Sequence, residues 1–388
     1  MKSSISSWSW PTRIAVFGAT VAFCLVVFGA FVRLSHAGLS CPDWPTCYGQ
    51  ASWPGHGSDI AQANAAFPDR PVEMHKTWRE QGHRMLAGAL GVLILALAAS
   101  AVWQRKRALG AIVIAAAIAA IGVVSYIKGA HDFSAICSVI ALAIPVFVAA
   151  RLERPAPWRI AVVLLSVVIF QAMLGMWTVT WLLKPVVVMS HLLGGLTTFA
   201  LLSYVALRLS GVGANDDHWA STRKLVAIGL LLLGLQIALG GWTSANYAAL
   251  TCGLDFPTCQ GQWWPPTDFH EGFVLWRGIG VNYEGGVLDV AARNAIQMAH
   301  RIGALIVFCY LGWLSHRLAR RGLRWPAIFL GIGLVIQVGL GIANIKLALP
   351  MPIALAHVSV AVILLFTLIF ILARTQRRVT TMPTFHDA

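Results

Sequence analysis

Residues 82–103 read GHRMLAGALGVLILALAASAVW, and residues 299–316 read AHRIGALIVFCYLGWLSH. Each stretch opens with a small residue, a histidine and an arginine, and then continues as an apolar run. A run of about 20 apolar residues spans the hydrocarbon layer of a bilayer as an α-helix. Histidine at membrane depth is rare and costly, so it usually faces the bundle interior and marks a working site. The two stretches therefore predict membrane helices that each carry a functional histidine near one end.

Similar apolar runs fill most of the chain. Its 388 residues are 58% hydrophobic and 11% charged, with a mean hydropathy of +0.72. Open sheet edges are not tolerated in lipid, so the runs predict an all-α polytopic membrane protein. Ten helices are expected, at about residues 14–32, 85–103, 109–127, 133–150, 160–183, 186–207, 225–245, 296–316, 326–345 and 353–373.

Basic residues are concentrated in every second loop, and this pattern predicts the orientation. Positive-inside bias places both termini in the cytoplasm and the long loops 33–80 and 246–295 outside. We therefore expect a multi-pass protein of the bacterial inner (cytoplasmic) membrane, in contact with lipid. The net charge of +14 is explained by these loops, and no nucleic-acid partner is expected.

The second half of the chain repeats the first. The pattern Gln-x-x-Leu-Gly begins twenty residues before both His191 and His357. Such self-similarity indicates two copies of one structural unit. We expect two pseudo-symmetric four-helix bundles, an N-terminal unit in residues 1–208 and a C-terminal unit in residues 209–388.

The two units differ in length at one place. His83 precedes His191 by 108 residues, whereas His300 precedes His357 by 57. The surplus, 108 − 57 = 51, matches a two-helix hairpin, and residues 105–155 contain two apolar runs. The first unit is therefore predicted to carry an inserted helical hairpin, which preserves the orientation of every later helix.

Four histidines occupy matching places in the two units: His83, His191, His300 and His357. A single histidine on an apolar face is more often a hydrogen-bonded core residue. Four in repeat register favour ligands, because bundle cores build cofactor sites from facing helices and haem iron accepts axial histidine. We expect two bis-histidine haem sites, with His83 paired to His191 and His300 to His357.

Glu80 lies three residues before His83, which on a helix places both side chains on one face. The matching residue in the second unit is Gln297, which does not ionise. The first site is thus predicted to contain a general acid/base beside its ligand, although an interfacial glutamate is the simpler alternative. Arg84 and Arg301 directly follow two of the histidines and would pair with haem propionates or anchor the helix ends.

Two pairs of cysteines lie in the predicted outer loops, Cys41 with Cys47 and Cys252 with Cys259. An oxidising compartment favours disulfides, and we expect one bond within each short loop. A cross-link between the loops and a shared zinc ion are the alternatives. His131, at the tip of the inserted hairpin, has no repeat counterpart and is interpreted as a loop residue.

Several motifs resemble the haem A synthase family. They include RLSHAGLSCPDWP from residue 33, PVEMHK from residue 71, EQGHR from residue 80, GMWTVT from residue 175 and EGFVLWR from residue 271. Together with the helices of His300 and His357, they cover nearly the whole chain except about residues 105–155. Members of this family usually have eight helices in two pseudo-symmetric bundles, so the hairpin is a departure.

The resemblance implies an oxidoreductase that converts haem O to haem A by oxidising the C8 methyl to a formyl through hydroxylated intermediates. It implies that His83, His191 and Glu80 form the catalytic site for haem O, and that His300 and His357 hold a haem b for electron transfer. Haem O synthase would supply the substrate, and cytochrome c oxidase assembly would use the product.

Other classes of protein share some of these features. A cytochrome b-like di-haem quinol or electron-transfer protein needs two bis-histidine haems but no glutamate at only one of them. A thiol-oxidising membrane protein would leave the histidines without a role. A transporter is disfavoured because charged residues and broken helices are missing from the predicted midplane.

Overall fold

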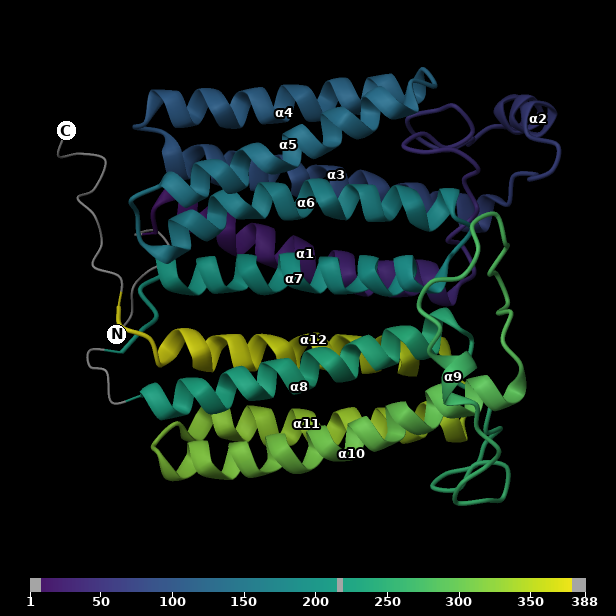
Figure 1. Cartoon of the computed structure of the whole chain (residues 1–388), viewed down its shortest axis with the longest axis vertical. Helices are drawn as coiled ribbons and strands as arrows, with labels where there is room; N and C mark the ends of the chain where they lie inside the picture. Colours follow the sequence, from purple (N-terminus) through teal and green to yellow (C-terminus); the bar gives the residue numbers. More distant parts are fainter. Residues whose placement is uncertain (1–7, 215–218, 379–388) are drawn as a thin grey trace.

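The structure is a computed structural model that describes residues 8–214 and 219–378, and each named element in these residues is a helix. Ten of the described helices are long and apolar enough to cross a membrane (Figure 1). They are α1 (Trp10–Leu34), α3 (Met74–Val102), α4 (Lys106–Ile127), α5 (His131–Arg151), α6 (Ala156–Thr180), α7 (Pro185–Leu209), α8 (Ala220–Ala245), α10 (Val290–Arg320), α11 (Arg324–Lys346) and α12 (Met351–Arg374). The short helices α2 (Gly57–Ala66) and α9 (Phe269–Gly272) lie in the long loops.

The prediction of ten membrane helices is confirmed, but two of them begin more than five residues before their apolar runs. α3 starts at Met74 and α10 at Val290, whereas the runs predicted starts near residues 85 and 296. The extra turns are polar, and loops satisfy them: Gln81 donates a hydrogen bond to the carbonyl of Ala51 at 2.7 Å. Asp289 caps α10 by accepting from the backbone N–H of Ala292 at 2.8 Å.

The first bundle contains α1, α3, α6 and α7. α1 and α6 each pack against both α3 and α7, so α3 and α7 lie on one diagonal of the bundle. The helices lie nearly antiparallel, as in other four-helix bundles, and Leu90, Leu164 and Leu202 are among the side chains that fill their core.

The second bundle repeats this arrangement with α8, α10, α11 and α12. α8 and α11 each pack against both α10 and α12, which therefore form the matching diagonal. The bundles meet where α7 packs against α8 and α12, and where α1 packs against α12. One hydrophobic core is continuous through both, for example from Phe199 to Leu368.

The inserted segment forms the expected helical hairpin, α4 and α5. It packs against α3 and α6 on the outside of the first bundle and adds no helix to its interior (Figure 1). Its outward side chains are large and apolar, including Val113, Ile121 and Phe147. Such a surface fits contact with lipid chains.

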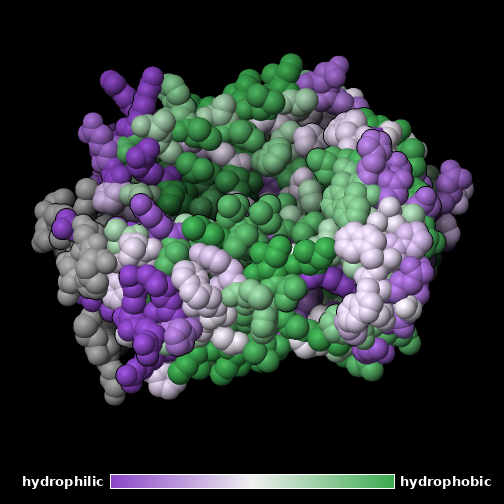
Figure 2. All heavy atoms as spheres, turned by 60° about the horizontal axis from the view of Figure 1, so that its bottom comes forward, coloured by the Kyte–Doolittle hydropathy of each residue, from purple (hydrophilic) through white to green (hydrophobic). Residues whose placement is uncertain are grey.

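The two ends of the helix assembly differ. Both disulfides and the long loops, residues 35–73 and 246–289, lie at one end, called here the disulfide end (Figure 1). The N-terminus of α1 and the C-terminus of α12 lie at the opposite end, which has only short connections between helices (Figure 1). Figure 2 shows a broad band of hydrophobic side chains between more polar regions at the two ends, as expected for a chain that spans a bilayer.

Candidate functional site

The four histidines lie at one level in the two bundles. α3, α7, α10 and α12 all begin at the disulfide end, and each carries its histidine in the half of the helix nearer to that end. In each bundle the two histidines therefore come from diagonally opposed helices. His83 and His191 are near enough to interact electrostatically, and so are His300 and His357.

A glycine on the neighbouring helix faces every one of these rings. A Cβ built on Gly29 of α1 would lie 3.0 Å from Cε1 of His83, and one on Gly175 of α6 would lie 3.1 Å from Cε1 of His191. In the second bundle, a Cβ built on Gly240 would lie 3.2 Å from Cε1 of His300, and one on Gly341 would lie 3.2 Å from Cε1 of His357. Any larger residue would displace the rings, so the glycines set where the histidines lie.

Three of the histidines also have a glutamine partner, one turn along the helix from the glycine. The Gln171 amide nitrogen lies 3.0 Å from Nδ1 of His191 and donates to its backbone oxygen at 2.7 Å. The Gln236 amide nitrogen makes the same two contacts with His300, at 3.0 Å to Nδ1 and 3.0 Å to the backbone oxygen. The glutamine amide nitrogen can only donate, so Nδ1 accepts in both contacts, and the contact fixes the orientation of each ring.

The remaining two rings differ from this pattern. Gln337 lies 3.2 Å from Nε2 of His357, whose Nδ1 is buried without a hydrogen-bond partner. His83 has no glutamine, because the position four residues before Gly29 is Leu25, and its Nδ1 is also buried and unpaired. His83 is therefore the least restrained of the four rings.

These observations test whether the residues fit haem. Two histidines on opposed helices, with ring nitrogens left unpaired or free and with space kept by glycines, suit a flat cofactor that accepts two axial ligands. Among residues 8–214 and 219–378, three or more His, Cys, Asp or Glu side chains do not converge anywhere. The donor set is thus paired histidines in each bundle, and it fits haem.

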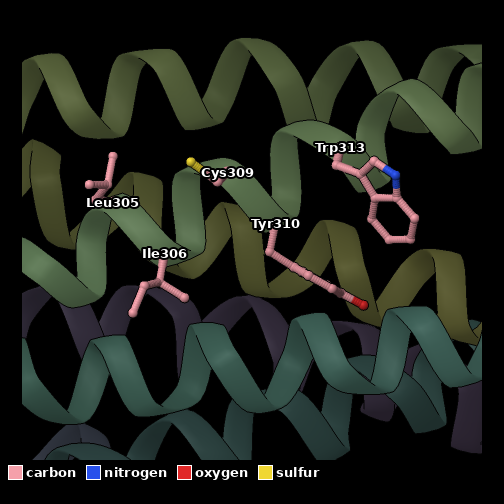
Figure 3. Close-up of a pocket in the computed structure, with 5 residues that line it drawn as sticks. All are labelled: Leu305, Ile306, Cys309, Tyr310 and Trp313. Atoms are coloured by element: carbon pink, nitrogen blue, oxygen red, sulfur yellow. The ribbon is translucent and has the colours of Figure 1, made fainter.

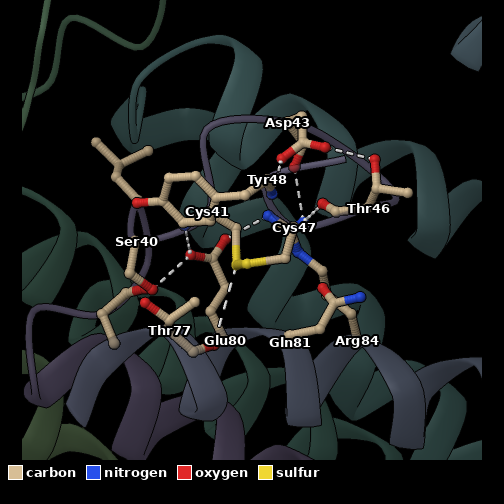
Figure 4. Close-up of a disulfide and its surroundings, with 12 residues drawn as sticks. Ser40, Cys41, Asp43, Thr46, Cys47, Tyr48, Thr77, Glu80, Gln81 and Arg84 are labelled. Atoms are coloured by element: carbon tan, nitrogen blue, oxygen red, sulfur yellow. Dashed lines mark hydrogen bonds and ion pairs between the residues drawn. A yellow bond between two sulfur atoms is a disulfide. The ribbon is translucent and has the colours of Figure 1, made fainter. Parts of the chain in front are cut away.

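Glu80 is buried beneath the first disulfide loop (Figure 4). Its Oε2 accepts hydrogen bonds from the backbone N–H of Cys41 at 2.8 Å and from the Ser40 hydroxyl at 3.0 Å. Its Oε1 pairs with the Arg84 guanidinium at 2.5 Å. The carboxylate is thus fixed in place by three donors, in the turn of α3 that precedes His83.

The second bundle lacks an acid at this place. Gln297 is also buried, but its Oε1 has no hydrogen-bond partner. The loop hydroxyl that corresponds to Ser40 belongs to Thr251, and it donates to Asn294 at 2.8 Å instead. The two sites therefore share their histidines and glycines and differ in the ionisable group.

The two arginines after the histidines hold the disulfide loops. Arg84 donates to the carbonyls of Asp43 and Thr46 at 2.7 and 2.8 Å. Arg301 donates to the carbonyls of residues 255, 257 and 258 at 2.9–3.0 Å. Sequence reasoning expected propionate pairing or interface anchoring, and the structure gives both guanidiniums loop carbonyls as partners.

All four outer cysteines are in disulfides within their own loops. Cys41 is bonded to Cys47, and Cys252 to Cys259. The predicted pairing agrees with the structure, and because all four sulfurs are used in these two bonds, neither a cross-link between the loops nor zinc binding by the four thiolates is compatible with it. Tyr48, next to the first disulfide, donates to the carbonyl of Arg70 at 3.0 Å, and burial raises the pKa of its phenol.

His131 lies at the disulfide end of the hairpin, away from the histidine pairs. Its ring centre lies 4.8 Å from that of Tyr126, with the two rings tilted. The Tyr126 ring centre in turn lies 5.6 Å from that of Trp44 in the first disulfide loop. His131 was expected to be a loop residue, but it is the first residue of α5. Through Tyr126 and Trp44 the hairpin braces the loop that covers Glu80.

An open apolar pocket lies elsewhere, on the outward side of α10 (Figure 3). Leu305, Ile306, Cys309, Tyr310 and Trp313 line it. The Tyr310 hydroxyl is engaged with the carbonyl of Leu225 at 2.9 Å. The pocket contains none of the four histidines and is not part of the candidate site.

Sequence reasoning noticed Gln171 and Gln337 only as markers of the repeat and did not single out Gln236. The usable signal was the pattern Gln-x-x-Leu-Gly, which occurs on α6, α8 and α11 and is replaced by Leu-Val-Val-Phe-Gly, residues 25–29, on α1. It would have revealed both the histidine partners and the exception at His83.

The chain is similar in sequence to a family of membrane proteins and to several proteins named heme A synthase. A family described as "cytochrome oxidase assembly protein" matches residues 12–130 and 132–369. These ranges include the hairpin, so the likeness extends over the segment of about residues 105–155 that the motifs had left outside it. Heme A synthase of Shewanella oneidensis is 36% identical over 80% of this chain and 78% of its own length.

More distant relatives carry the same name. Heme A synthase of Bacillus licheniformis is 24% identical over 82% of this chain and 80% of its own length. That of Mesorhizobium japonicum is 26% identical over 78% of this chain and 71% of its own length. With the family match over almost all ten membrane helices, this chain belongs to the COX15-CtaA family of cytochrome oxidase assembly proteins.

Proposed function

We propose that this protein is a haem A synthase, an oxidoreductase that converts the C8 methyl of haem O to a formyl through hydroxylated intermediates. The proposal assigns the substrate to His83 and His191 in the unit of residues 1–208. It assigns an electron-transferring haem b to His300 and His357 in the unit of residues 209–388. Haem iron held by two histidines supplies one-electron redox chemistry.

One observation carries this division of labour. The two bundles repeat the histidine and glycine arrangement, yet only the first has a buried carboxylate in the turn before a histidine. An electron carrier has no use for an acid/base group at one of two equivalent sites. A site that oxidises a carbon does, because protons leave the substrate as electrons are removed.

The contacts of Glu80 suggest how protons would be handled. Ser40 donates to Oε2 of Glu80 and also lines a polar pocket at the disulfide end, together with Tyr48, Asp69 and Arg70. Protons would pass between Oε2 and this pocket through the Ser40 hydroxyl. Arg84 and the N–H of Cys41 keep the carboxylate in position for that exchange.

The remaining roles follow from the same assignment. The basic loops support an inner-membrane location with both termini in the cytoplasm, which puts the histidine pairs near the outer surface. Haem O synthase would deliver the substrate within the membrane, and cytochrome c oxidase assembly would receive the product. A cytochrome b-like di-haem quinol oxidase is the second candidate, because the paired histidines alone suit it equally.

Extraction of the haems from the purified protein, with identification by chromatography and mass, separates the two candidates. If the protein is a haem A synthase, the extract should contain haem b together with haem O, haem A or a hydroxylated intermediate between the two. A protein that contains haem b alone, even when made in cells that produce haem O, would be an electron carrier, and the proposal would be wrong.

A further inference from the structure

Lys184 occupies an unusual place in the turn between α6 and α7. Its side chain is fully buried, and its ammonium has no hydrogen-bond acceptor among the described residues. Burial lowers the pKa of this amine. A buried ammonium costs free energy unless it is paired, and the protein offers it only two aromatic rings.

Those rings come from different parts of the chain. Nζ of Lys184 lies 3.3 Å from the centre of the Trp276 ring and 5.2 Å from that of Trp181. Trp276 belongs to the long loop of the second unit, and its own side chain is 63% exposed. The backbone N–H of Tyr283 in that loop donates to the carbonyl of Leu182 at 3.1 Å. The second unit thus covers the disulfide end of the first at Lys184.

The repeat shows that the fold itself does not need a lysine here. Lys184 lies seven residues before His191, and Pro350 lies seven before His357. The pair of residues before each has the same left-handed backbone, with φ of 49° and 59° before Lys184 and 58° and 60° before Pro350. The two turns are alike in shape, so the buried ammonium is a feature of the first site alone, as Glu80 is.

The position relative to His191 indicates what the ammonium serves. Seven residues are nearly two helical turns, so Lys184 lies at the start of α7 on the face that carries His191. The N-terminus of α7 adds its partial positive charge at this point. An ammonium and a helix N-terminus together favour a carboxylate, and the two aromatic rings hold the ammonium in place.

We propose that Lys184 binds a carboxylate side chain of the tetrapyrrole held by His83 and His191, with Trp276 closing over the contact. This inference rests on the proposed function, because it requires a porphyrin between those histidines. It makes Lys184 a positioning residue, which fixes the rotation of the ring and so selects which methyl faces the acid. The second unit, with Pro350, holds its haem without such an anchor at this turn.

The test compares a haem that has free carboxylates with one that lacks them. The full-length protein in detergent, with His300→Ala and His357→Ala so that one histidine pair remains, is titrated with iron protoporphyrin IX and with its dimethyl ester. The variants are Lys184→Gln, which removes the charge, and Lys184→Arg, which keeps it. Lys128→Gln removes the same charge from an exposed lysine at the same end and is the matched control.

In the parent and in Lys128→Gln, the free acid should bind about tenfold more tightly than the ester, the size of one charge-assisted hydrogen bond. Lys184→Gln should lose most of that preference without weakening ester binding, and Lys184→Arg should retain most of it. In the chain with both pairs intact, Lys184→Gln should also lower the haem retained per chain after purification.

An unchanged preference in Lys184→Gln would overturn the inference and leave the proposed function standing. Equal weakening of acid and ester would show that Lys184 only supports the fold, and it too would overturn the inference. If the unsubstituted protein, with both histidine pairs intact, binds neither compound, the proposed function is overturned and this inference with it.

Discussion

At the residue scale, the difference between the two histidine sites is Glu80, which is replaced by Gln297 at the second site. Its carboxylate is held by Arg84, Ser40 and the N–H of Cys41, so it links the disulfide loop to the turn before His83. Sequence comparison of the repeats identified the residue, but only the structure shows these donors. The same contacts mean that a change at Glu80 also acts on the loop above it.

Replacement of Glu80 by glutamine tests the acid/base role. Glutamine keeps the shape and an oxygen acceptor for the N–H of Cys41, so the protein should fold and retain haem. Production of haem A should fall by about 10²–10⁴-fold, the usual contribution of a positioned acid or base, and a hydroxylated intermediate should accumulate. Chromatography of extracted haems measures both quantities. Gln297→Glu is the control and should not raise activity, while wild-type rates in Glu80→Gln would falsify the role.

His300 and His357 are the expected ligands of the haem b. Alanine at either position should remove most of the low-spin haem b absorption while leaving the first bundle intact, because the ligands come from separate helices of the second bundle. His131→Ala should leave the spectrum unchanged, since that ring lies at the hairpin tip with Tyr126. A normal haem b spectrum in both ligand variants would show that the iron is held elsewhere.

At the scale of elements, each histidine helix depends on a glycine in the helix beside it. Gly175→Ala would put a methyl 3.1 Å from Cε1 of His191, so the ring must move. We expect a severalfold loss of haem from the first site, visible in the haem-to-protein ratio. Gly88→Ala on α3 is the control, because nothing lies within 4 Å of the added atom, and it should retain haem. Equal retention in both would mean that the rings have more room than the structure shows.

Much of the architecture could be predicted from residue patterns, for identifiable reasons. Charge-free runs located ten helices because lipid tolerates few other residues there, and the offset between repeats identified α4 and α5 as an insertion. The starts of α3 and α10 were missed because their polar turns are satisfied by loops distant in sequence. The partners of Arg84 and the burial of Lys184 could not be predicted from the sequence, because they also depend on contacts between distant residues. Trp276, which covers Lys184, lies about ninety residues further along the chain.

At the scale of the whole molecule, the two bundles are joined at both ends. At the disulfide end, Arg33 of α1 donates to the Tyr247 hydroxyl at 2.7 Å and to the carbonyl of Ser244 at 2.8 Å. Tyr247 also stacks on His36, its counterpart in the repeat, at 6.3 Å. These contacts tie the two bundles together at this end and so help to fix the distance between the two histidine pairs.

At the opposite end, the buried Arg208 of α7 joins the bundles. Its guanidinium donates to the carbonyl of Ala373 of α12 at 3.0 Å, to that of Val212 at 2.8 Å and to that of Arg377. Arg208→Met would leave the buried carbonyl of Ala373 without this donor, at a cost of about 1–3 kcal/mol, and would remove the two part-buried contacts as well. We expect a lower temperature for loss of the haem b absorption and faster hydrogen exchange at the end of α12.

Arg320→Met provides the matched comparison. Arg320 lies exposed in the last turn of α10, so this substitution removes the same charge from the same end of the molecule without breaking a buried contact. It should leave the transition temperature nearly unchanged, as most exposed substitutions do. If Arg208→Met and Arg320→Met behave alike, charge rather than hydrogen bonding governs this end of the molecule. If only Arg208→Met loosens α12, the carbonyl contacts hold the second haem site at its distance from the first.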